Sequence, residues 1–340
     1  MRIHKFQTTE AFIAIDLDGA EASSGPVRWA KKILQGGAKD LARSQTYTYA
    51  ALGMQRGGAS AGISAPPDQR AEAITAFIEE MGALVADGTY LPDAAKGVGA
   101  NDLDGLRGDD PRDTARLGEF ADRCDGLSAA VSADQAVGLD GKTVAIDGFE
   151  GIGAWIADGV VGRGARVTAI STATGTVTNP DGFAVADLSE AVATHGSDCV
   201  NAFGEVGHPK AVFGSGADVV FAGSKTGIVD HVVAEQLSGC AAVVAAGRLH
   251  LTARGLAVLR RAGVAAPADF VSLAGSTLAA WGDLNRSDDE ILAGVREDVG
   301  DLCDEHRGHD DGLLLAACYH AEDFLLQWQS ELPFGRPLAP

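Results

Sequence analysis

Residues 141–153 read GKTVAIDGFEGIG, and this stretch decides the fold. Lys142 to Asp147 is an apolar run that favours a buried strand, and a glycine-rich turn follows it directly. Apolar residues then recur at helical spacing from Ile152 to Val161. A strand, a glycine turn and a helix in this order predict the opening of a βαβ unit.

The same alternation continues towards the C-terminus. Further strand candidates are ARVTAI from Ala165, DVVFA from Asp218 and AAVVAA from Ala241, with helical segments between them. Alternating strands and helices predict a Rossmann-like, doubly wound parallel sheet. Helical spacing resumes from Asp288 to Gln329, so we expect helices after the sheet.

The N-terminal part mixes both kinds of element. Phe12 to Asp16 alternates as a strand does, and Pro66-Pro67-Asp68 begins a helix that ends near Gly88. Pro92 to Arg112 is rich in glycine and aspartate and favours loops, whereas Asp113 to Leu127 has the spacing of an amphipathic helix. We therefore predict a separate N-terminal domain with a small mixed sheet.

The charge composition indicates the environment of the protein. Its 32 Asp and 15 Glu oppose 8 Lys and 19 Arg, which gives a net charge of -20. Such an excess of carboxylates predicts a halophilic protein adapted to molar cytoplasmic salt, where screening limits repulsion between them. The alternative is an ordinary acidic bacterial protein. In either case no nucleic-acid partner is expected, because phosphates would be repelled.

Neither disulfides nor a metal site are predicted. The five cysteines lie far apart without a C-x-x-C pair, and the only close histidines, His306 and His309, are expected to be exposed. The N-terminus lacks the apolar core of a signal peptide, and no segment offers eighteen uninterrupted apolar residues. We expect a soluble, cytoplasmic protein without a membrane span.

A second informative stretch, Leu41 to Ile63, reads LARSQTYTYAALGMQRGGASAGI. It resembles the amino-acid dehydrogenase family (glutamate, leucine, phenylalanine and valine dehydrogenases), whose segment runs L-A-x-x-M-T-[YW]-K-x-A and then G-G-[GA]-K-x-x-I. The glycines fall on Gly57 and Gly58, whereas the two lysines fall on Thr48 and Ser60. Five further segments resemble the family in the same order along the chain. They are GPVR from Gly25, the site of Tyr90, GKTVAIDGFEGIG from Gly141, ADVVFAGSKTGIV from Ala217 and ADFVSLAGST from Ala268.

The resemblance implies the domain organisation. It places a substrate-type domain at residues 1–127, a dinucleotide-binding-type domain at 128–284, and C-terminal helices at 285–340 that pack toward the first domain.

The resemblance also implies where catalytic groups belong. In the family one lysine pairs with the substrate carboxylate and the other, with a depressed pKa, assists water; Thr48 and Ser60 supply neither a cation nor a base. The aspartate that moves protons falls on Ala95, or on Gly97 in a second alignment. Asp93 and Lys96 are the nearest replacements for an acid and a cation.

The cofactor turn is altered in the same way. The family pattern G-x-G-x-x-G falls on Gly148, Glu150 and Gly153, so a carboxylate stands where a glycine lets the backbone approach a pyrophosphate. A second register, G-x-x-G-x-G, includes Gly151 and stays open for another nucleotide. The acidic residue expected after the second strand is replaced by Thr172.

Two hypotheses follow. The family asparagine and second glycine near the substrate cleft, which also includes Gly57 and Gly58, correspond to Leu273 and Ser276. Where the family has another asparagine after a turn, this chain has Gly247-Arg248-Leu249. Loss at every polar position predicts a catalytically degenerate homologue, or pseudoenzyme, with a regulatory or structural role, in a homo-oligomer or beside an active paralogue. The alternative is an active NAD- or NADP-dependent amino-acid dehydrogenase with rearranged residues.

Overall fold

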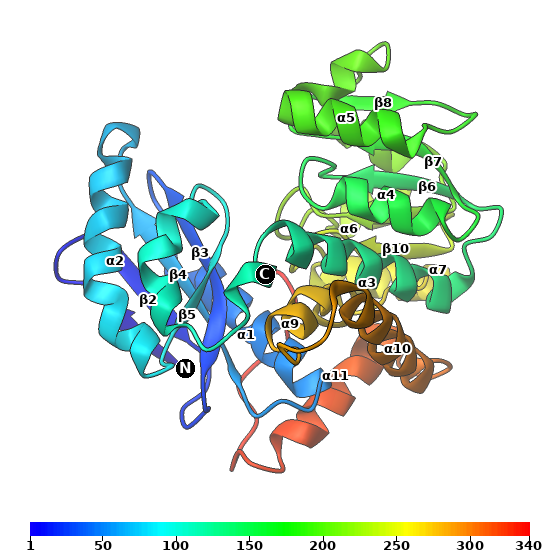
Figure 1. Cartoon of the computed structure of the whole chain (residues 1–340). Helices are drawn as coiled ribbons and strands as arrows, with labels where there is room; N and C mark the ends of the chain where they lie inside the picture. Colours follow the sequence, from blue (N-terminus) through cyan, green and yellow to red (C-terminus); the bar gives the residue numbers. More distant parts are fainter. The chain divides into compact units, whose positions relative to one another are not determined.

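The computed structural model describes all 340 residues, and they form two compact units (Figure 1). Unit 1 comprises residues 1–120, 279–284 and 319–337. Unit 2 comprises residues 121–278, 285–318 and 338–340. The division at residues 127 and 284, and the packing of the C-terminal helices, stay predictions. Two parallel-containing sheets with C-terminal helices confirm the predicted α/β fold class.

Unit 1 is built on a mixed five-stranded sheet with the order β1-β2-β4-β3-β5. The strands β1 and β2 pair in antiparallel fashion, as do β2 and β4, whereas β3 lies parallel to both β4 and β5. The strand bounds are β1 Arg2–Lys5, β2 Ala11–Ile15, β3 Ser23–Ala30, β4 Gly57–Ser64 and β5 Leu91–Ala94.

Two helices pack on opposite faces of this sheet. The helix α1 (Gln35–Ala51) contacts β4 closely, since a Cβ on Gly58 would lie 1.8 Å from the carbonyl oxygen of Ala42. The helix α2 (Arg70–Ala86) covers the other face, and Phe77 and Met81 bury themselves with the odd-numbered residues of β4. Short turns η1 (Pro67–Gln69), η2 (Ala100–Asp109) and η3 (Thr114–Arg116) and the helix α11 (Leu313–Leu325) complete the elements that reach this unit.

Unit 2 is built on a second five-stranded sheet with the order β10-β9-β6-β7-β8. Four strands are parallel, as predicted, and β8 pairs with β7 in antiparallel fashion. The bounds are β6 Thr143–Asp147, β7 Arg166–Ser171, β8 Thr176–Thr178, β9 Val219–Ala222 and β10 Ala242–Ala245. The central strands are apolar on both faces, which is typical of a sheet covered on both sides.

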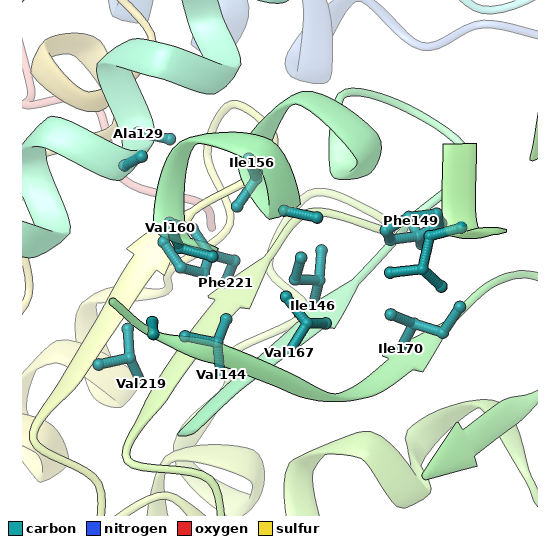
Figure 2. Close-up of a cluster of buried hydrophobic side chains, with 14 of the residues drawn as sticks. Ala129, Val144, Ile146, Phe149, Ile156, Val160, Val167, Ile170, Val219 and Phe221 are labelled. Carbon is teal, nitrogen blue, oxygen red and sulfur yellow. The ribbon is translucent and has the colours of Figure 1, made fainter. Parts of the chain in front are cut away.

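The core of unit 2 lies between this sheet and the helices α3, α4 and α5. Figure 2 shows Ile156 and Val160 of α4 against Ile146 and Val167 of the strands. The helix bounds are α3 Glu119–Val137, α4 Gly153–Val161, α5 Val185–His195, α6 His231–Gln236, α7 Ala253–Ala262, α8 Asp269–Ser272, α9 Gly275–Ala280 and α10 Asp288–His306, and the turns are η4 Gly196–Ala202 and η5 Pro209–Gly214.

The predicted helix from Asp113 to Leu127 was wrong at both ends. The chain forms a short turn at η3, held by the Asp113 carboxylate, which accepts a hydrogen bond from the backbone N–H of Ala115 at 3.2 Å. Gly118 then adopts φ +98°, a left-handed conformation that a helix cannot contain, so α3 begins at Glu119. It continues to Val137, where Gly138 at φ +64° ends it.

Candidate functional site

Thr48 and Ser60 lie on neighbouring elements of unit 1, and both side chains are fully buried. The Thr48 hydroxyl, on α1, donates to the carbonyl oxygen of Ser44 at 3.2 Å. The Ser60 hydroxyl, on β4, donates to the carbonyl oxygen of Pro26 at 3.0 Å. Both hydroxyls therefore serve the local backbone, and neither carries charge.

Gly57 and Gly58 begin β4 where it meets α1. The backbone N–H of Gly58 donates to the Thr46 hydroxyl at 2.9 Å. Because an added Cβ at Gly58 would also overlap the backbone of α1, this glycine is required for packing. A Cβ at Gly57 would lie 2.9 Å from the Ser23 hydroxyl, so this position is tight as well.

Asp93 lies at the end of β5 and pairs with Arg112, a residue that the sequence did not single out. The Arg112 guanidinium is buried and bonds the Asp93 carboxylate at 2.5 Å and the Asp110 carboxylate at 2.8 and 2.9 Å. Burial alone would lower the pKa of Arg112, but the charges of Asp93 and Asp110 raise it above its ordinary value. This network fixes the Asp93 carboxylate, which stays about one-third exposed.

The other candidates on this loop are not drawn into the network. Lys96 is exposed, and its carbonyl oxygen accepts a hydrogen bond from the backbone N–H of Trp29 at 2.9 Å. Ala95 forms an isolated bridge with Val98. Gly97 lies against Trp29 at φ +78°. No acidic side chain therefore stands at either position that the resemblance assigns to the catalytic aspartate.

Tyr49, the residue after Thr48, belongs to a series of hydrogen-bonded polar side chains. The Trp281 indole donates to the Tyr49 hydroxyl at 2.8 Å, and the Tyr49 hydroxyl lies 2.5 Å from that of Ser24. The Arg56 guanidinium stacks on Trp281, 3.8 Å from its ring centre. Burial raises the pKa of Tyr49, so its hydroxyl stays neutral at physiological pH.

In unit 2 the turn after β6 keeps two of the three expected glycine roles. Gly148 adopts φ +79°, and a Cβ there would lie 2.7 Å from the backbone nitrogen of Ser224. Gly153 begins α4, and a Cβ there would lie 2.6 Å from the Phe149 ring. Gly151 has room for a side chain, since the nearest atom would lie 3.5 Å away. Gly148 and Gly153 end both registers, so only the middle position distinguishes them, and Gly151, the middle glycine of G-x-x-G-x-G, has no steric need to be a glycine. The packing therefore does not favour that register over G-x-G-x-x-G.

Glu150, at the middle position of G-x-G-x-x-G, is exposed and bonds the turn to its neighbours. Its carboxylate accepts hydrogen bonds from the backbone N–H of Ala173 at 3.0 Å and from the Ser197 hydroxyl at 3.5 Å. The Thr172 hydroxyl donates to the carbonyl oxygen of Ser197 at 2.6 Å. The turn, the loop after β7 and the start of η4 are thus joined by one acidic side chain.

Asp147, the last residue of β6, holds the loop after β9. One carboxylate oxygen accepts hydrogen bonds from the backbone N–H groups of Gly223 and Ser224 at 3.1 and 3.0 Å, and the other from the Ser171 hydroxyl at 3.2 Å. The carboxyl ends of parallel strands are where ligands bind in open α/β sheets. Here Asp147 already satisfies the donors nearest to it.

The segment after β10 contains the only non-glycine residue with a positive φ, Leu249 at φ +55°. Its backbone N–H donates to the Asp269 carboxylate at 2.8 Å. The conformation suits asparagine or glycine far better than leucine, and Leu249 lies in the segment Gly247-Arg248-Leu249 where the resemblance expects an asparagine. The next residue, His250, is 1% exposed.

Leu273 and Ser276 surround a charged group that the sequence missed. The backbone N–H of Ser276 donates to the Asp125 carboxylate at 2.7 Å, and Arg248 donates to the carbonyl oxygen of Leu273 at 3.4 Å. Burial raises the pKa of Asp125 to about 7, against the opposing charge of Arg248. Asp125 and Ser276 lie 151 positions apart, so spacing could not reveal this pair.

No group of three or more histidine, cysteine, aspartate or glutamate side chains in the chain is arranged to hold a metal ion. All five cysteines are free thiols, and four are buried. No helix is long and apolar enough to cross a membrane.

Comparison with known proteins places these observations in a family. The model of the Glutamate/Leucine/Phenylalanine/Valine dehydrogenase family matches residues 127–285. This domain belongs to the amino-acid dehydrogenase family. The family predicted from the sequence is thereby confirmed.

Solved structures share the fold of the whole chain at low identity. A hetero-hexameric glutamate dehydrogenase from Thermus thermophilus, in a leucine-bound form, matches 92% of this chain and 83% of its own, with a TM-score of 0.78 and 21% identity. Another glutamate dehydrogenase matches 94% of this chain and 81% of its own, with a TM-score of 0.80 and 17% identity. The glutamate dehydrogenase from Plasmodium falciparum matches 94% of this chain and 79% of its own, with a TM-score of 0.74 and 15% identity. No curated protein sequence gives a significant match.

Proposed function

We propose that this chain is a catalytically degenerate amino-acid dehydrogenase homologue that acts as a regulatory or structural subunit beside an active paralogue. One observation carries the proposal. Thr48 and Ser60, where the resemblance places the two lysines, are buried hydroxyls bonded to backbone carbonyl groups of their own unit. Neither position offers a cation for a substrate carboxylate or a base that titrates near neutral pH.

The surrounding residues support the same conclusion. The carboxylate nearest in sequence to Ala95, where the resemblance places the catalytic aspartate, is that of Asp93. Arg112 holds this carboxylate, and proton transfer would require Asp93 to leave that ion pair. In unit 2 Glu150 places a negative charge in the turn that would face a pyrophosphate. Two like charges about 4 Å apart repel by roughly 4 kcal/mol at an effective dielectric constant of 20. NAD or NADP would therefore bind weakly.

A partnered role is favoured over a solitary one. The Thermus thermophilus structure is described as hetero-hexameric and leucine-bound, so this fold assembles from unlike chains in at least one relative. A subunit without chemistry can still bias its partner through differential contacts in two states.

Activity and assembly test the proposal together. Purified chain in molar KCl should show no glutamate or leucine oxidation with NAD or NADP, because loss of both lysines removes several kcal/mol of transition-state stabilisation. The tagged chain, isolated from its own cells, should carry an active glutamate or leucine dehydrogenase with it. A turnover of about one per second by the chain alone would overturn the degenerate assignment, and isolation as a homo-oligomer without dehydrogenase activity would overturn the partnered role.

The second candidate is an active dehydrogenase with Asp93 and Lys96 recruited, and it has one observation in its favour. The strand, the left-handed Gly148 and the helix start at Gly153 keep the geometry of a nucleotide-binding turn. Under this hypothesis Asp93→Asn and Lys96→Gln each abolish turnover. Glu150→Gly should raise dinucleotide affinity under either hypothesis. Weaker binding by Glu150→Gly would show that Glu150 contacts the ligand.

A further inference from the structure

His250 is a buried histidine whose side chain makes no hydrogen bond. It is 1% exposed, and neither Nδ1 nor Nε2 has a partner. A buried polar atom left without a partner loses its hydrogen bond to water and gains none in return, and an imidazole has two such atoms. The position therefore carries an energetic penalty that an apolar side chain of similar size would avoid.

Two buried carboxylates act on this imidazole, and each also holds a backbone segment. Asp269, at the start of α8, accepts the N–H of Leu249, the residue before His250. Asp147, at the end of β6, accepts the N–H groups of Gly223 and Ser224 after β9. Asp147 is 3% exposed and Asp269 is 2% exposed, so water does not screen their charges fully.

The loops at this edge of the sheet touch backbone to backbone. A Cβ on Gly223 would lie 2.5 Å from the carbonyl carbon of Ala246, and one on Gly247 would lie 2.7 Å from the carbonyl oxygen of Gly223. A Cβ on Gly148 would lie 2.7 Å from the nitrogen of Ser224. The loop after β9 therefore has no free space on the sides of the segment before His250 and of the turn at Gly148, and it can move only away from them or together with them.

We propose that His250 is a proton-operated latch: in its neutral form it leaves Asp147 bound to the amides of Gly223 and Ser224, and in its charged form it draws the Asp147 carboxylate away and releases that loop. The imidazolium has two N–H donors, and Asp147 and Asp269 are the two acceptors whose charges reach it. Protonation thus lets both ring nitrogens of His250 donate hydrogen bonds, and it takes the Asp147 carboxylate away from the amides of Gly223 and Ser224. The inference concerns the edge of the sheet itself and goes beyond the proposed function.

The direction of the effect follows from burial. Burial lowers the pKa of His250, and the charges of Asp269 and Asp147 oppose that shift. The closed loop therefore prefers the neutral imidazole. Its stability is constant above the ordinary histidine pKa and is lost as the pH falls from there to the lowered value. The latch opens on the acid side.

Residue-resolved amide exchange tests the latch in the intact chain. Protection of the Gly223 and Ser224 amides, corrected for the intrinsic rate, should fall by roughly tenfold for each pH unit over part of the range below the ordinary histidine pKa of 6.5. In His250→Gln, and in the apolar variant His250→Leu, protection should stay constant over the same range. The exposed His231 provides the matched control, since His231→Gln should behave as the wild type.

Titration of the imidazole in the unmodified protein gives an independent measurement if either variant fails to fold. The NMR shift of the His250 ring should change over the same pH range as the loss of protection. An equal loss of protection in the His250 variants overturns the proposal, because another group would then control the loop. Constant protection in the wild type, or an imidazole that titrates at a different pH from the loop, overturns it too.

Discussion

At the scale of single residues, the same substitution should have opposite effects at two glycines of unit 1. A Cβ at Gly58 would lie 1.8 Å from the Ala42 carbonyl oxygen, so Gly58→Ala must separate α1 from β4. We expect a loss of about 3 kcal/mol or more, as for other overpacked cores. Gly82, inside α2, has nothing within 4 Å of its added Cβ, and Gly82→Ala should stabilise by about 0.5–1 kcal/mol. Urea unfolding of both variants measures the difference.

Loss of stability at Gly82→Ala, or an unaffected Gly58→Ala, would contradict this account of α1 packing. The sequence shows that Gly58 belongs to a glycine pair and that Gly82 lies in a helical pattern, but it does not show how much room each glycine has. What separates them is a contact made 16 residues earlier in the chain, between Ala42 and Gly58.

Asp125 should make stability depend on pH near neutrality. Its folded-state pKa is raised to about 7, so its contribution is fully present below the ordinary aspartate pKa and is lost as the pH rises through 7. Asp125→Asn keeps an acceptor for the Ser276 N–H and avoids the buried charge. We expect this variant to be about 1 kcal/mol more stable than the wild type at pH 8, after allowance for partial exposure, and similar to it at pH 5. Thermal unfolding across this range is the measurement, and an unchanged difference between pH 5 and 8 would contradict it.

At the scale of elements, strand and helix types were predictable where the apolar pattern is long. The sequence predicted β6, β7, β9 and β10 because each is an apolar run next to a glycine or a charged residue. It missed β8, since three residues cannot show a period, and of the five strands in unit 1 it named only β2. It also placed the start of α3 six residues early, because the apolar spacing across Asp113 to Leu117 suits a helix and a short turn equally well.

The site was less predictable than the elements, for a physical reason. Thr48, Ser60 and Glu150 were found by comparison with a motif, which reveals what is missing. The polar groups near these positions meet only in the folded chain: Arg112 reaches Asp93 across 19 positions, and Trp281 reaches Tyr49 across 232. The ring nitrogens of His250 make no hydrogen bond, so no spacing between bonded residues marks this side chain.

The Arg112 network should join β5 to the loop that follows η2 with unequal strength at its two carboxylates. The side chain of Asp110 is 1% exposed and that of Asp93 is 35% exposed. Asp110→Asn removes a buried counter-charge and should cost about 2–4 kcal/mol. Asp93→Asn removes a partly solvated one and should cost less than about 1 kcal/mol. Chemical denaturation distinguishes the two, and equal losses would show that Asp93 bears as much of the pairing as Asp110.

At the scale of the whole molecule, charge rather than packing should set the salt dependence of stability. The net charge of -20 was read from the sequence, and the structure shows how like charges meet on α10. Burial, followed by the charge of the exposed Glu297 and then that of the exposed Asp301, raises the pKa of Asp298, with Arg286 opposing. Neighbouring carboxylates on this helix therefore already repel one another.

Lowering KCl from molar to about 0.1 M lengthens the screening distance from roughly 3 to 10 Å, so this repulsion acts over more of the surface. We expect the melting temperature to fall by about 5 °C or more. The double variant Glu297→Gln, Asp301→Asn removes two of the charges around Asp298. Its melting temperature should fall less than that of the wild type over the same range of KCl concentration. Sodium chloride at equal ionic strength distinguishes screening from a specific need for potassium. A melting temperature that does not change with KCl would contradict both the halophilic hypothesis and the view that α10 is a source of repulsion.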